Sequence, residues 1–341
     1  MSQLPDINWS EGDLAATLQA MKLLGPGEPY RVETLGGGVS CDVLAVHAGG
    51  RSFCVKRALA RLRVEADWRA PVERAEAEVA WFRLVAAIDP TLVPQVLAED
   101  RARHAFAMSY LPPETHPLWK AQLAAGQADP DFAAQVGAAL VRIHAATAAR
   151  SDIAAQFANR EQFFALRLEP YLLFTAARHR EVAPRIRELA QSIAASRIAL
   201  MHGDVSPKNI LCGPEGPVFL DAETTCIGDP AFDLAFCLNH LLLKCVWHPE
   251  HSAAYLDSLA RLKDAYLAGV SWEPCREIER RTTSLLPALL LARIDGKSPV
   301  EYLTSERDKD FVRTCAKQML LGESLDLNAI QRKWKGALAL R

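Results

Sequence analysis

The sequence predicts an α+β protein of two lobes, in which a small antiparallel β-sheet with one helix precedes a larger, mostly helical part. Three observations favour this class. Short β-like runs separated by glycine-rich turns occupy residues 30–110. Apolar residues at helical spacing dominate the rest of the chain. The length of 341 residues suits two domains better than one. We therefore expect an N-terminal lobe over 1–110 and a C-terminal lobe over 111–341.

The N-terminal lobe is predicted to begin with three strands, in the runs YRVETL, DVLAVHA and RSFCVKRAL. A helix follows in PVERAEAEVAWFRLVAAI, and Pro71 is placed to start it. Val79, Phe82 and Val85 recur there at helical spacing. The runs LVPQVLAED and HAFAMSYL complete the sheet as two further strands, and the double proline of YLPPE marks the lobe boundary.

The C-terminal lobe is predicted to be helical in DPDFAAQVGAALVRIHAATAA and over 160–200 and 250–340. The segment 201–224, MHGDVSPKNILCGPEGPVFLDAET, interrupts these helices with a loop followed by the strand PVFLD. Within this segment, Asp204, Asp221, Glu223 and Asn209 stand among residues that favour burial. Clefts between lobes commonly bind small molecules, so we regard these polar residues as candidates for chemistry.

The composition disfavours several classes of function. Hydrophobic residues make up 50% of the chain, charged residues 23%, and the formal net charge is −2, so neither a nucleic acid nor a membrane is expected as a partner. No apolar run approaches the ~18 residues of a membrane span, and no signal peptide is evident. The eight cysteines show neither a CxxC pair nor metal-ligand spacing. We expect a cytoplasmic protein with reduced thiols.

The polar residues of 201–224 have the spacing of a phosphoryl-transfer site. Asp204 and Asn209 are five residues apart, as are the acid and the amide of the kinase loop H-R-D-x-x-x-x-N. Asp221 follows twelve residues after Asn209, at the end of an apolar run. Phosphoryl transfer needs one carboxylate to orient and deprotonate a hydroxyl, and oxygen ligands for Mg²⁺ on the phosphates.

The motifs HGDVSPKNIL, FLDAE and GDPAFDLA together resemble the aminoglycoside phosphotransferase and choline kinase superfamily, from about residue 30 to about residue 320. The resemblance implies a protein-kinase-like fold with a nucleotide-binding N-terminal lobe and a catalytic, substrate-binding C-terminal lobe. It implies an ATP-dependent small-molecule kinase that moves the γ-phosphoryl group to a hydroxyl of a sugar, an amino alcohol or an aminoglycoside-like acceptor. ATP and Mg²⁺ would be the cofactors. In this pattern Asp204 is the catalytic base, and Asn209 and Asp221, with Glu223 as a further candidate, hold the metal.

The same resemblance assigns a nucleotide site to the N-terminal lobe. Gly36, Gly37 and Gly38 would let backbone N–H groups approach the phosphates. Lys56, twenty residues later in FCVKRA, would reach the α- and β-phosphates. Taken alone, these features indicate only a hairpin turn and an exposed strand lysine, but their order is the one that the fold requires.

Two further nucleotide-site features are expected. A helix glutamate should hold Lys56, and Glu78 fits best because the apolar residues after it then fall on the buried face, with Glu76 as the rival. For either glutamate, a solvated helix face is an equal alternative. MSYLPP resembles the hinge, where backbone groups of Ser109 to Leu111 would bond the adenine.

Other polar residues of the motifs have alternative interpretations. His202 is expected to pack structurally under the loop, and Asp233 to anchor the loop backbone. Asp229 could serve either loop structure or substrate contact. DAE in place of D-F-G resembles the methylthioribose kinase branch, and LLARIDGKSPVEYL resembles a segment that this branch places near its substrate. Arg293 is therefore a candidate for contacting the substrate, against the alternative of a surface helix arginine.

The acceptor is less well determined. Residues 240–341 contain 16 basic and 13 acidic residues, which favours a neutral or anionic acceptor over a polycation. The aromatic residues of this region are expected to pack, although they could line a pocket. The separation of 58 positions from His144 to His202 of the HGD loop, and the missing A-P-E element, disfavour a protein kinase. The alternative from another class is a nucleotide-binding pseudokinase scaffold. The oligomeric state stays open.

Overall fold

The computed structural model describes residues 9–36, 40–63, 70–158, 160–323 and 325–341. The chain forms two compact units, Met1–Pro112 and Pro113–Arg341. The first unit contains a five-stranded antiparallel sheet and the second is mostly helical, which confirms the predicted α+β class.

The sheet of the first unit has the strand order β1-β2-β3-β5-β4, with every neighbouring pair antiparallel. Its strands are β1 (Tyr30–Thr34), β2 (Cys41–Ala48), β3 (Arg51–Ala58), β4 (Val96–Asp100) and β5 (Ala105–Ser109). All five correspond to strands that the sequence predicts. Short 3₁₀ turns, η1 (Pro90–Leu92) and η2 (Arg101–Arg103), flank β4.

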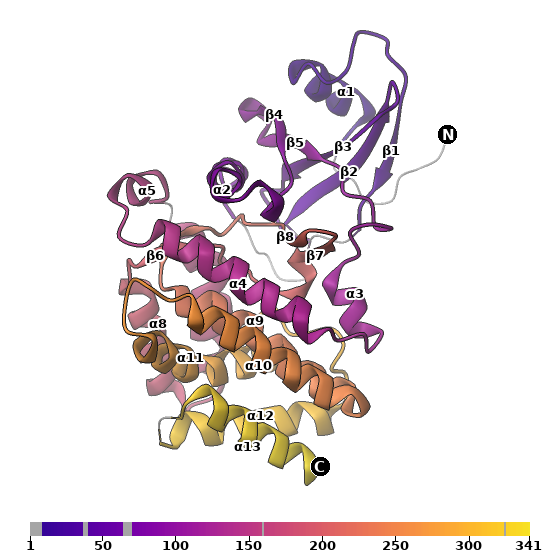
Figure 1. Ribbon diagram of the computed structural model, residues 1–341. Coiled ribbons are helices and arrows are strands. Elements are labelled where there is room, and N and C mark those ends of the chain that lie inside the picture. Colours follow the sequence, from indigo (N-terminus) through magenta and orange to yellow (C-terminus); the bar gives the residue numbers. More distant parts are fainter. Residues whose placement is uncertain (1–8, 37–39, 64–69, 159, 324) are drawn as a thin grey trace. The chain divides into compact units, whose positions relative to one another are not determined.

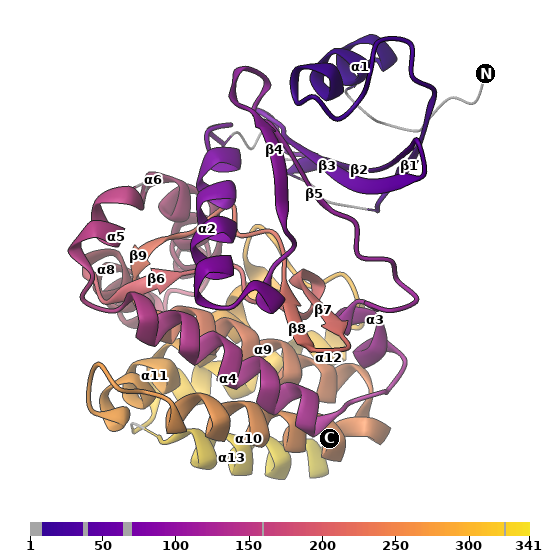
Figure 2. The same cartoon turned by 45° about the horizontal axis from the view of Figure 1, so that its top comes forward.

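Helix α2 (Arg74–Ile88) contacts β3, β4 and β5, and Figure 2 shows it beside β4. Val79, Phe82 and Val85 are buried as predicted, and the Phe82 ring meets Phe106 of β5 edge-on at 6.1 Å between centroids. The helix begins three residues after Pro71, which was expected to start it.

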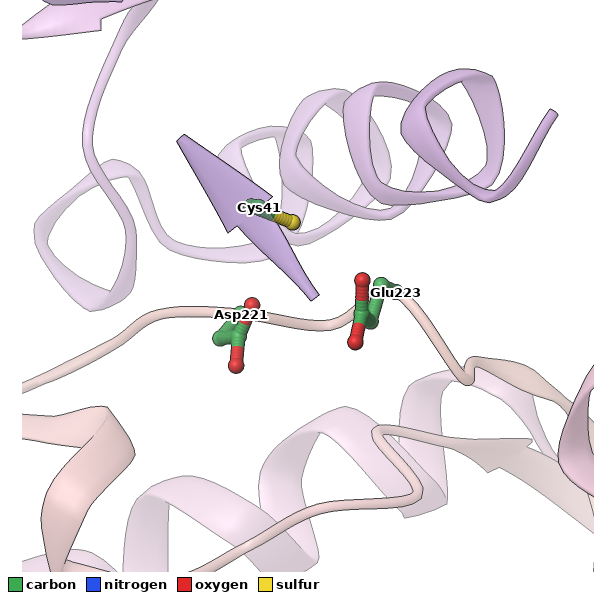
Figure 3. Close-up of side chains that lie close together, drawn as sticks. All are labelled: Cys41, Asp221 and Glu223. Carbon is green, nitrogen blue, oxygen red and sulfur yellow. The ribbon is translucent and has the colours of Figure 1, made fainter. Parts of the chain in front are cut away.

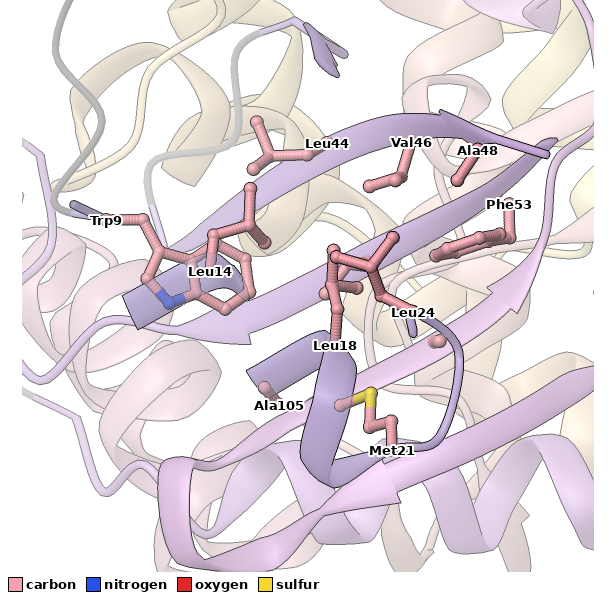
Figure 4. Close-up of a cluster of buried hydrophobic side chains, with 12 residues drawn as sticks. Trp9, Leu14, Leu18, Met21, Leu24, Leu44, Val46, Ala48, Phe53 and Ala105 are labelled. Carbon is pink, nitrogen blue, oxygen red and sulfur yellow. The ribbon is translucent and has the colours of Figure 1, made fainter. Parts of the chain in front are cut away.

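Helix α1 (Glu11–Ala20) is absent from the prediction. Ser10 caps it by accepting a hydrogen bond from the Asp13 N–H at 3.1 Å. Apolar side chains of α1 and of the turn after it pack on β2 and β3 (Figure 4). The cluster includes Trp9, Leu14, Leu18, Met21, Leu24, Leu44, Val46, Ala48 and Phe53. This cluster packs against β3, the strand that carries Lys56.

The second unit is organised around helix α9 (Pro230–Trp247), in which every residue except Trp247 is buried. Helices α10 (Ser252–Ala268) and α11 (Cys275–Asp295) pack on it. Because α9 is buried on all sides, its apolar residues are not confined to one face and it lacks the amphipathic period by which helices are recognised, so the sequence does not predict it.

Helices α4 (Pro130–Thr147) and α10 lie side by side (Figure 1) and approach closely at Gly137. A Cβ atom at this glycine would stand 2.2 Å from the Leu262 carbonyl oxygen. The remaining helices are α3 (Trp119–Ala124), α5 (Ser151–Gln156), α6 (Arg160–Phe163), α7 (Phe174–Arg178), α8 (Ala183–Ala195), α12 (Glu306–Leu321) and α13 (Leu327–Ala339), with 3₁₀ turns η4 (Pro207–Asn209) and η5 (Pro249–His251).

Between α6 and α7 the chain forms a π-helix, η3 (Phe164–Leu173), which contains Pro170. Two small antiparallel ribbons complete the unit: β6 (Ala199–Met201) pairs with β9 (Cys226–Gly228), and β7 (Ile210–Gly213) pairs with β8 (Gly216–Phe219). These ribbons hold the ends of the loops that carry the polar residues of 201–224.

Candidate active site

The HGD loop leaves β6 through a glycine that its surroundings require. Gly203 has φ +81°, in the left-handed region that side chains disfavour. A Cβ atom there would stand 2.5 Å from the Thr224 Oγ1 atom. The glycine therefore allows the loop to turn against the segment that follows β8.

Asp233 of α9 anchors this loop. Its Oδ2 accepts from the His202 N–H at 2.7 Å and its Oδ1 from the Gly203 N–H at 2.8 Å, while His144 Nε2 lies 3.2 Å from Oδ2. The His202 ring lies between Leu220 O, 2.9 Å from Nε2, and the Asp204 N–H, which donates to Nδ1 at 3.1 Å. Burial lowers the pKa of His202, consistent with a neutral, structural ring.

Asp204 is buried and has two dissimilar carboxylate oxygens. Oδ2 receives Asn209 Nδ2 at 2.8 Å, Lys208 Nζ at 2.9 Å and Arg167 Nη2 at 2.9 Å. Oδ1 has no hydrogen-bond partner among the described residues. A buried carboxylate oxygen without a donor is costly, so Oδ1 is the atom at which a hydroxyl group would find a partner.

The charges around Asp204 keep it ionised. Burial by itself would raise the pKa of this carboxyl group, but the Arg167 guanidinium and the Lys208 ammonium outweigh burial and lower the pKa below its usual range. The same carboxylate helps to raise the pKa of Lys208 despite the opposing effect of burial.

The sequence reasoning missed Arg167 and Lys208 as site residues. Lys208 lies inside the quoted motif, four residues after Asp204, and that spacing could have identified it. Arg167 comes from the π-helix, and its Nε also donates to the Gly203 carbonyl at 2.8 Å. Only the fold brings this residue to the loop, so no local spacing in the sequence indicates it.

The three residues predicted to hold metal all lie in the segment 209–223 of the second unit. The Asn209 amide nitrogen donates to Asp204 O at 3.0 Å and to Asp204 Oδ2, which leaves the amide oxygen to face a cation. Asp221 and Glu223 project from the segment after β8 (Figure 3), with carboxylate oxygens within 4.8 Å of one another. Asp221 adopts φ 65°, a left-handed conformation that aspartate tolerates better than most residues.

This donor set fits a hard divalent cation. Its atoms are two carboxylates and one neutral amide oxygen, which are the ligand types that Mg²⁺ favours. The carboxylates of Asp204, Glu223 and Asp221 all act on the Arg167 guanidinium and favour its charged form. Lys208 Nζ lies 3.7 Å from Asp221 as well as 2.9 Å from Asp204.

In the first unit, Lys56 pairs with Glu78. The ammonium lies 2.8 Å from Glu78 Oε1 and 2.7 Å from Oε2, and both side chains are buried. The rival, Glu76, instead bonds His104 Nδ1 at 2.9 Å. The geometry thus distinguishes the two glutamates that the sequence left open.

Only some of the other residues predicted for the nucleotide site lie within the described parts of the chain. Gly36 is exposed at the end of β1, whereas Gly37 and Gly38 lie outside the described residues. The Ser109 N–H donates to the Gln95 carbonyl at 2.9 Å, so it does not fit the predicted adenine donor. For the Ser109 carbonyl and for Leu111, which follows β5, a hydrogen bond to the adenine stays a prediction.

Of the two predicted substrate residues, Asp229 has a structural environment. It caps α9 by accepting from the Ala231 N–H at 3.0 Å, and its Oδ2 accepts from Arg281 Nε at 2.8 Å. These contacts favour the loop-structure alternative. Arg293 is buried rather than exposed on a helix surface, and its Nη1 donates to the Tyr171 hydroxyl at 3.2 Å and to the Ser298 carbonyl.

The fold and this loop geometry define a kinase-like protein of the small-molecule type. The model of the phosphotransferase enzyme family matches residues 31–277 of the chain. The chain therefore belongs to that family, which confirms the resemblance found in the sequence.

Several known proteins are similar to it. "Methylthioribose kinase 2" from Oryza sativa subsp. japonica is 25% identical over 252 residues, which are 66% of this chain and 59% of that protein. The chain thus spans about three fifths of the length of the curated relatives that it matches.

Among solved structures, a choline/ethanolamine kinase family protein from Mesorhizobium loti has a TM-score of 0.55 at 18% identity, covering 97% of this chain and 99% of that one. The amicoumacin kinase hAmiN, in complex with AMP-PNP, Ca²⁺ and Ami, has a TM-score of 0.52 at 13% identity, covering 97% and 94%. These structures confirm the protein-kinase-like fold. Over the described parts of the chain, no helix has both the length and the apolar character needed to traverse a bilayer.

Proposed function

We propose that this protein is an ATP-dependent kinase that transfers the γ-phosphoryl group to a hydroxyl of a small molecule, with Asp204 as the group that receives the hydroxyl proton. The observation that carries the proposal is the asymmetry of Asp204. Three donors hold Oδ2, and Oδ1 is buried without a partner among the described residues. A base for an alcohol needs this combination of a fixed orientation and one open acceptor atom.

The proposed step is an in-line displacement at phosphorus. The acceptor hydroxyl donates its hydrogen bond to Asp204 Oδ1, and its oxygen forms the new O–P bond as the bond to the ADP oxygen breaks. The hydroxyl proton passes to Asp204, and the leaving oxygen departs with its electron pair on ADP. Arg167 and Lys208 hold Oδ2 during the step and offset the charge that accumulates nearby.

Asn209, Asp221 and Glu223 would hold Mg²⁺ through their oxygen atoms. When bound, the metal supplies positive charge that neutralises the phosphate oxygens. Lys208 would keep Asp204 and Asp221 from repelling one another before the metal arrives, because it lies within 4 Å of both carboxylates. The AMP-PNP and Ca²⁺ in the amicoumacin kinase structure support ATP with a divalent ion as the cofactor pair.

The nucleotide phosphates are proposed to contact Lys56, held by Glu78, and the glycine segment that begins at Gly36. The backbone near Ser40 is fixed by the buried Arg74, whose Nη2 donates to the Ser40 carbonyl at 2.6 Å and to the Leu59 carbonyl at 2.7 Å. A fixed end for this segment favours a defined approach of backbone N–H groups to phosphate.

The acceptor is proposed to be a hydroxylated small molecule, and the relatives offer sugars and amino alcohols as starting candidates. A coupled ADP-release assay with Mg·ATP should be run against aminoglycosides, methylthioribose and related sugars, choline, ethanolamine and homoserine. Stimulation by one acceptor class would support transfer. No observation on the described residues favours the pseudokinase alternative, because the predicted base and metal ligands are all present.

Replacing the proposed base gives the decisive variant. Asp204→Ala should bind nucleotide like the unaltered protein and lose at least ~10²-fold in turnover, the range expected when a general base is lost. Asp204→Asn is the matched control for volume, and it should be as inactive because an amide cannot take the proton. Turnover in Asp204→Ala within a few-fold of that of the unaltered protein would contradict the assignment of Asp204 as the base.

A further inference from the structure

A second group of polar side chains in the helical unit has no role in the step above. His240 and Lys244 lie four residues apart on α9, hence on one face of that helix. Arg293 comes from α11, which packs against α9. All three are buried, with exposed fractions of 7%, 1% and 7% respectively. We refer to these three residues as the basic cluster.

Within the described residues, the basic cluster lacks the carboxylate partners that some other buried basic residues have. Lys263 pairs with Asp264, and Arg167 pairs with Asp204 at 2.9 Å. Within the described residues, no carboxylate lies within ion-pair distance of any member of the basic cluster. The acid with the clearest influence on Lys244 is Glu301, which itself pairs with Lys120.

Each member also presents a nitrogen that lacks a hydrogen bond. His240 Nε2, Lys244 Nζ and Arg293 Nε are all buried and have no partner among the described residues. Buried polar atoms have hydrogen-bond partners in the great majority of cases, and an exception calls for an explanation such as a bound ion or water. Three such nitrogens on two packed helices indicate a shared ligand rather than three separate defects.

The electrostatics of the basic cluster favour an anion. Burial, followed by the charge of Lys120, lowers the pKa of Lys244 to about 7. Burial and the charges of Arg293 and Lys244 lower the pKa of His240 well below its ordinary value. Positive charge is thus disfavoured until a negative group arrives.

The basic cluster connects to the candidate active site through one ring. Arg293 Nη1 donates to the Tyr171 hydroxyl at 3.2 Å, and the Arg293 guanidinium carbon lies 5.6 Å from the centre of that ring. The Arg167 guanidinium carbon lies 5.8 Å from the same ring centre, and Arg167 pairs with Asp204. Arg293 and Arg167 thus contact the same ring, which places Arg293 close to the residue that pairs with Asp204.

The aromatic residues beside the basic cluster exclude one class of acceptor. Lys244 Nζ lies 4.0 Å from the centre of the Trp247 ring and 3.9 Å from that of Tyr302, and the two rings are stacked at 4.7 Å. Paired aromatic faces of this kind bind quaternary ammonium groups. Here the protein's own Lys244 side chain occupies the space over these faces, so they do not serve a cationic acceptor.

We propose that His240, Lys244 and Arg293 bind an anionic group, a carboxylate or a phosphate monoester, on the acceptor whose hydroxyl reacts at Asp204. The role of this site in holding the acceptor rests on the proposed kinase function, whereas the anion site itself rests on the burial and the unpaired nitrogens of the basic cluster. An anion site here restricts the proposed acceptors from all hydroxylated small molecules to those that carry an acidic group.

Binding should be measured separately from turnover. Isothermal titration calorimetry of the Asp204→Asn protein with glycerate and glycerol 3-phosphate tests the carboxylate and the phosphate arms, with glycerol and ethanolamine as neutral and cationic controls. At least one anion should bind, and the controls should bind at least about tenfold more weakly, as for the loss of hydrogen bonds to a charged group. Equal binding of glycerol, or no binding of either anion at tens of millimolar, would overturn the proposal.

Two variants test whether the anion binds at the basic cluster. Lys244→Met and Arg293→Met should each weaken the anion by about tenfold or more, and Lys263→Met, which removes a buried but paired lysine, should not. Lys244→Met replaces an unpaired buried charge with an apolar group of similar length, so the fold should be retained. Anion affinity unchanged in both cluster variants would reject the site.

The kinase proposal and the anion proposal can fail independently. Anion binding that depends on Lys244, without ADP release from any acidic acceptor, would retain the site and reject the kinase function. ADP release with a neutral acceptor, at a KM unaffected by Lys244→Met, would retain the kinase function and reject the anion site.

Discussion

Lys208 contacts two carboxylates that the proposed reaction uses differently. It lies 2.9 Å from Asp204 and 3.7 Å from Asp221, and it is one of the charges that lower the pKa of Asp204. A lysine in this position affects catalysis through the protonation state of the base as well as through direct contact.

Removing Lys208 should therefore move the pH dependence in a defined direction. The depressed pKa keeps Asp204 ionised as the pH falls, so Lys208→Met should raise that pKa and shift the acid limb of kcat/KM to higher pH. A pH–rate profile checks this, with Lys335→Met on the exposed face of α13 as the control. An unshifted acid limb would show that Lys208 does not influence the base.

Lys56 and the two glutamates of α2 allow a paired test. Glu78→Gln removes the carboxylate that holds the buried Lys56 ammonium and should weaken ATP by roughly tenfold or more. Glu76→Gln removes a partner of His104 and should leave ATP affinity nearly unchanged. A nucleotide titration of both variants provides the comparison. Equal effects would contradict the assignment of Glu78.

At the scale of helices, alanine substitutions at two glycines inside helices should change the stability of the protein in opposite directions. Gly137→Ala would place a methyl group 2.2 Å from the Leu262 carbonyl, forcing α4 and α10 apart and costing about 1–3 kcal/mol. Gly336→Ala in α13 meets no atom within 4 Å and should stabilise by up to about 1 kcal/mol. Thermal unfolding of the two variants tests both signs. A Gly137→Ala protein as stable as the parent would refute the close approach.

The elements differ in how far the sequence could predict them. The five strands and α2 follow from alternation, glycine turns and apolar spacing, and the HGD loop follows from its motif. The period of 3.6 residues does not reveal α9, which is buried all round, or the π-helix, which departs from that period. The position of Arg167 depends on the π-helix, and the burial of Arg293 depends on α9, so both needed the structure.

At the scale of the whole molecule, nucleotide binding should increase the thermal stability of the protein. A ligand present at a hundredfold its Kd stabilises the folded state by about 2.7 kcal/mol, which for a chain of 341 residues corresponds to a rise in Tm of roughly 4 °C. Mg·ATP should produce such a shift, and ATP with a chelator a smaller one. Asp221→Asn should remove most of the difference between the two conditions. A calorimetric scan with and without Mg²⁺ measures it, and equal shifts would argue against a metal held by Asp221.

The bonds from Asp233 to the HGD loop have a consequence for entropy. Because Asp233 belongs to the most enclosed helix and receives the His202 and Gly203 N–H groups, the loop loses its backbone freedom when the protein folds. Ordering a residue costs about 1–2 kcal/mol, and here that ordering is complete before any substrate arrives. Association then requires little further loss of freedom from the loop, so more of the contact energy can align the hydroxyl with the phosphate.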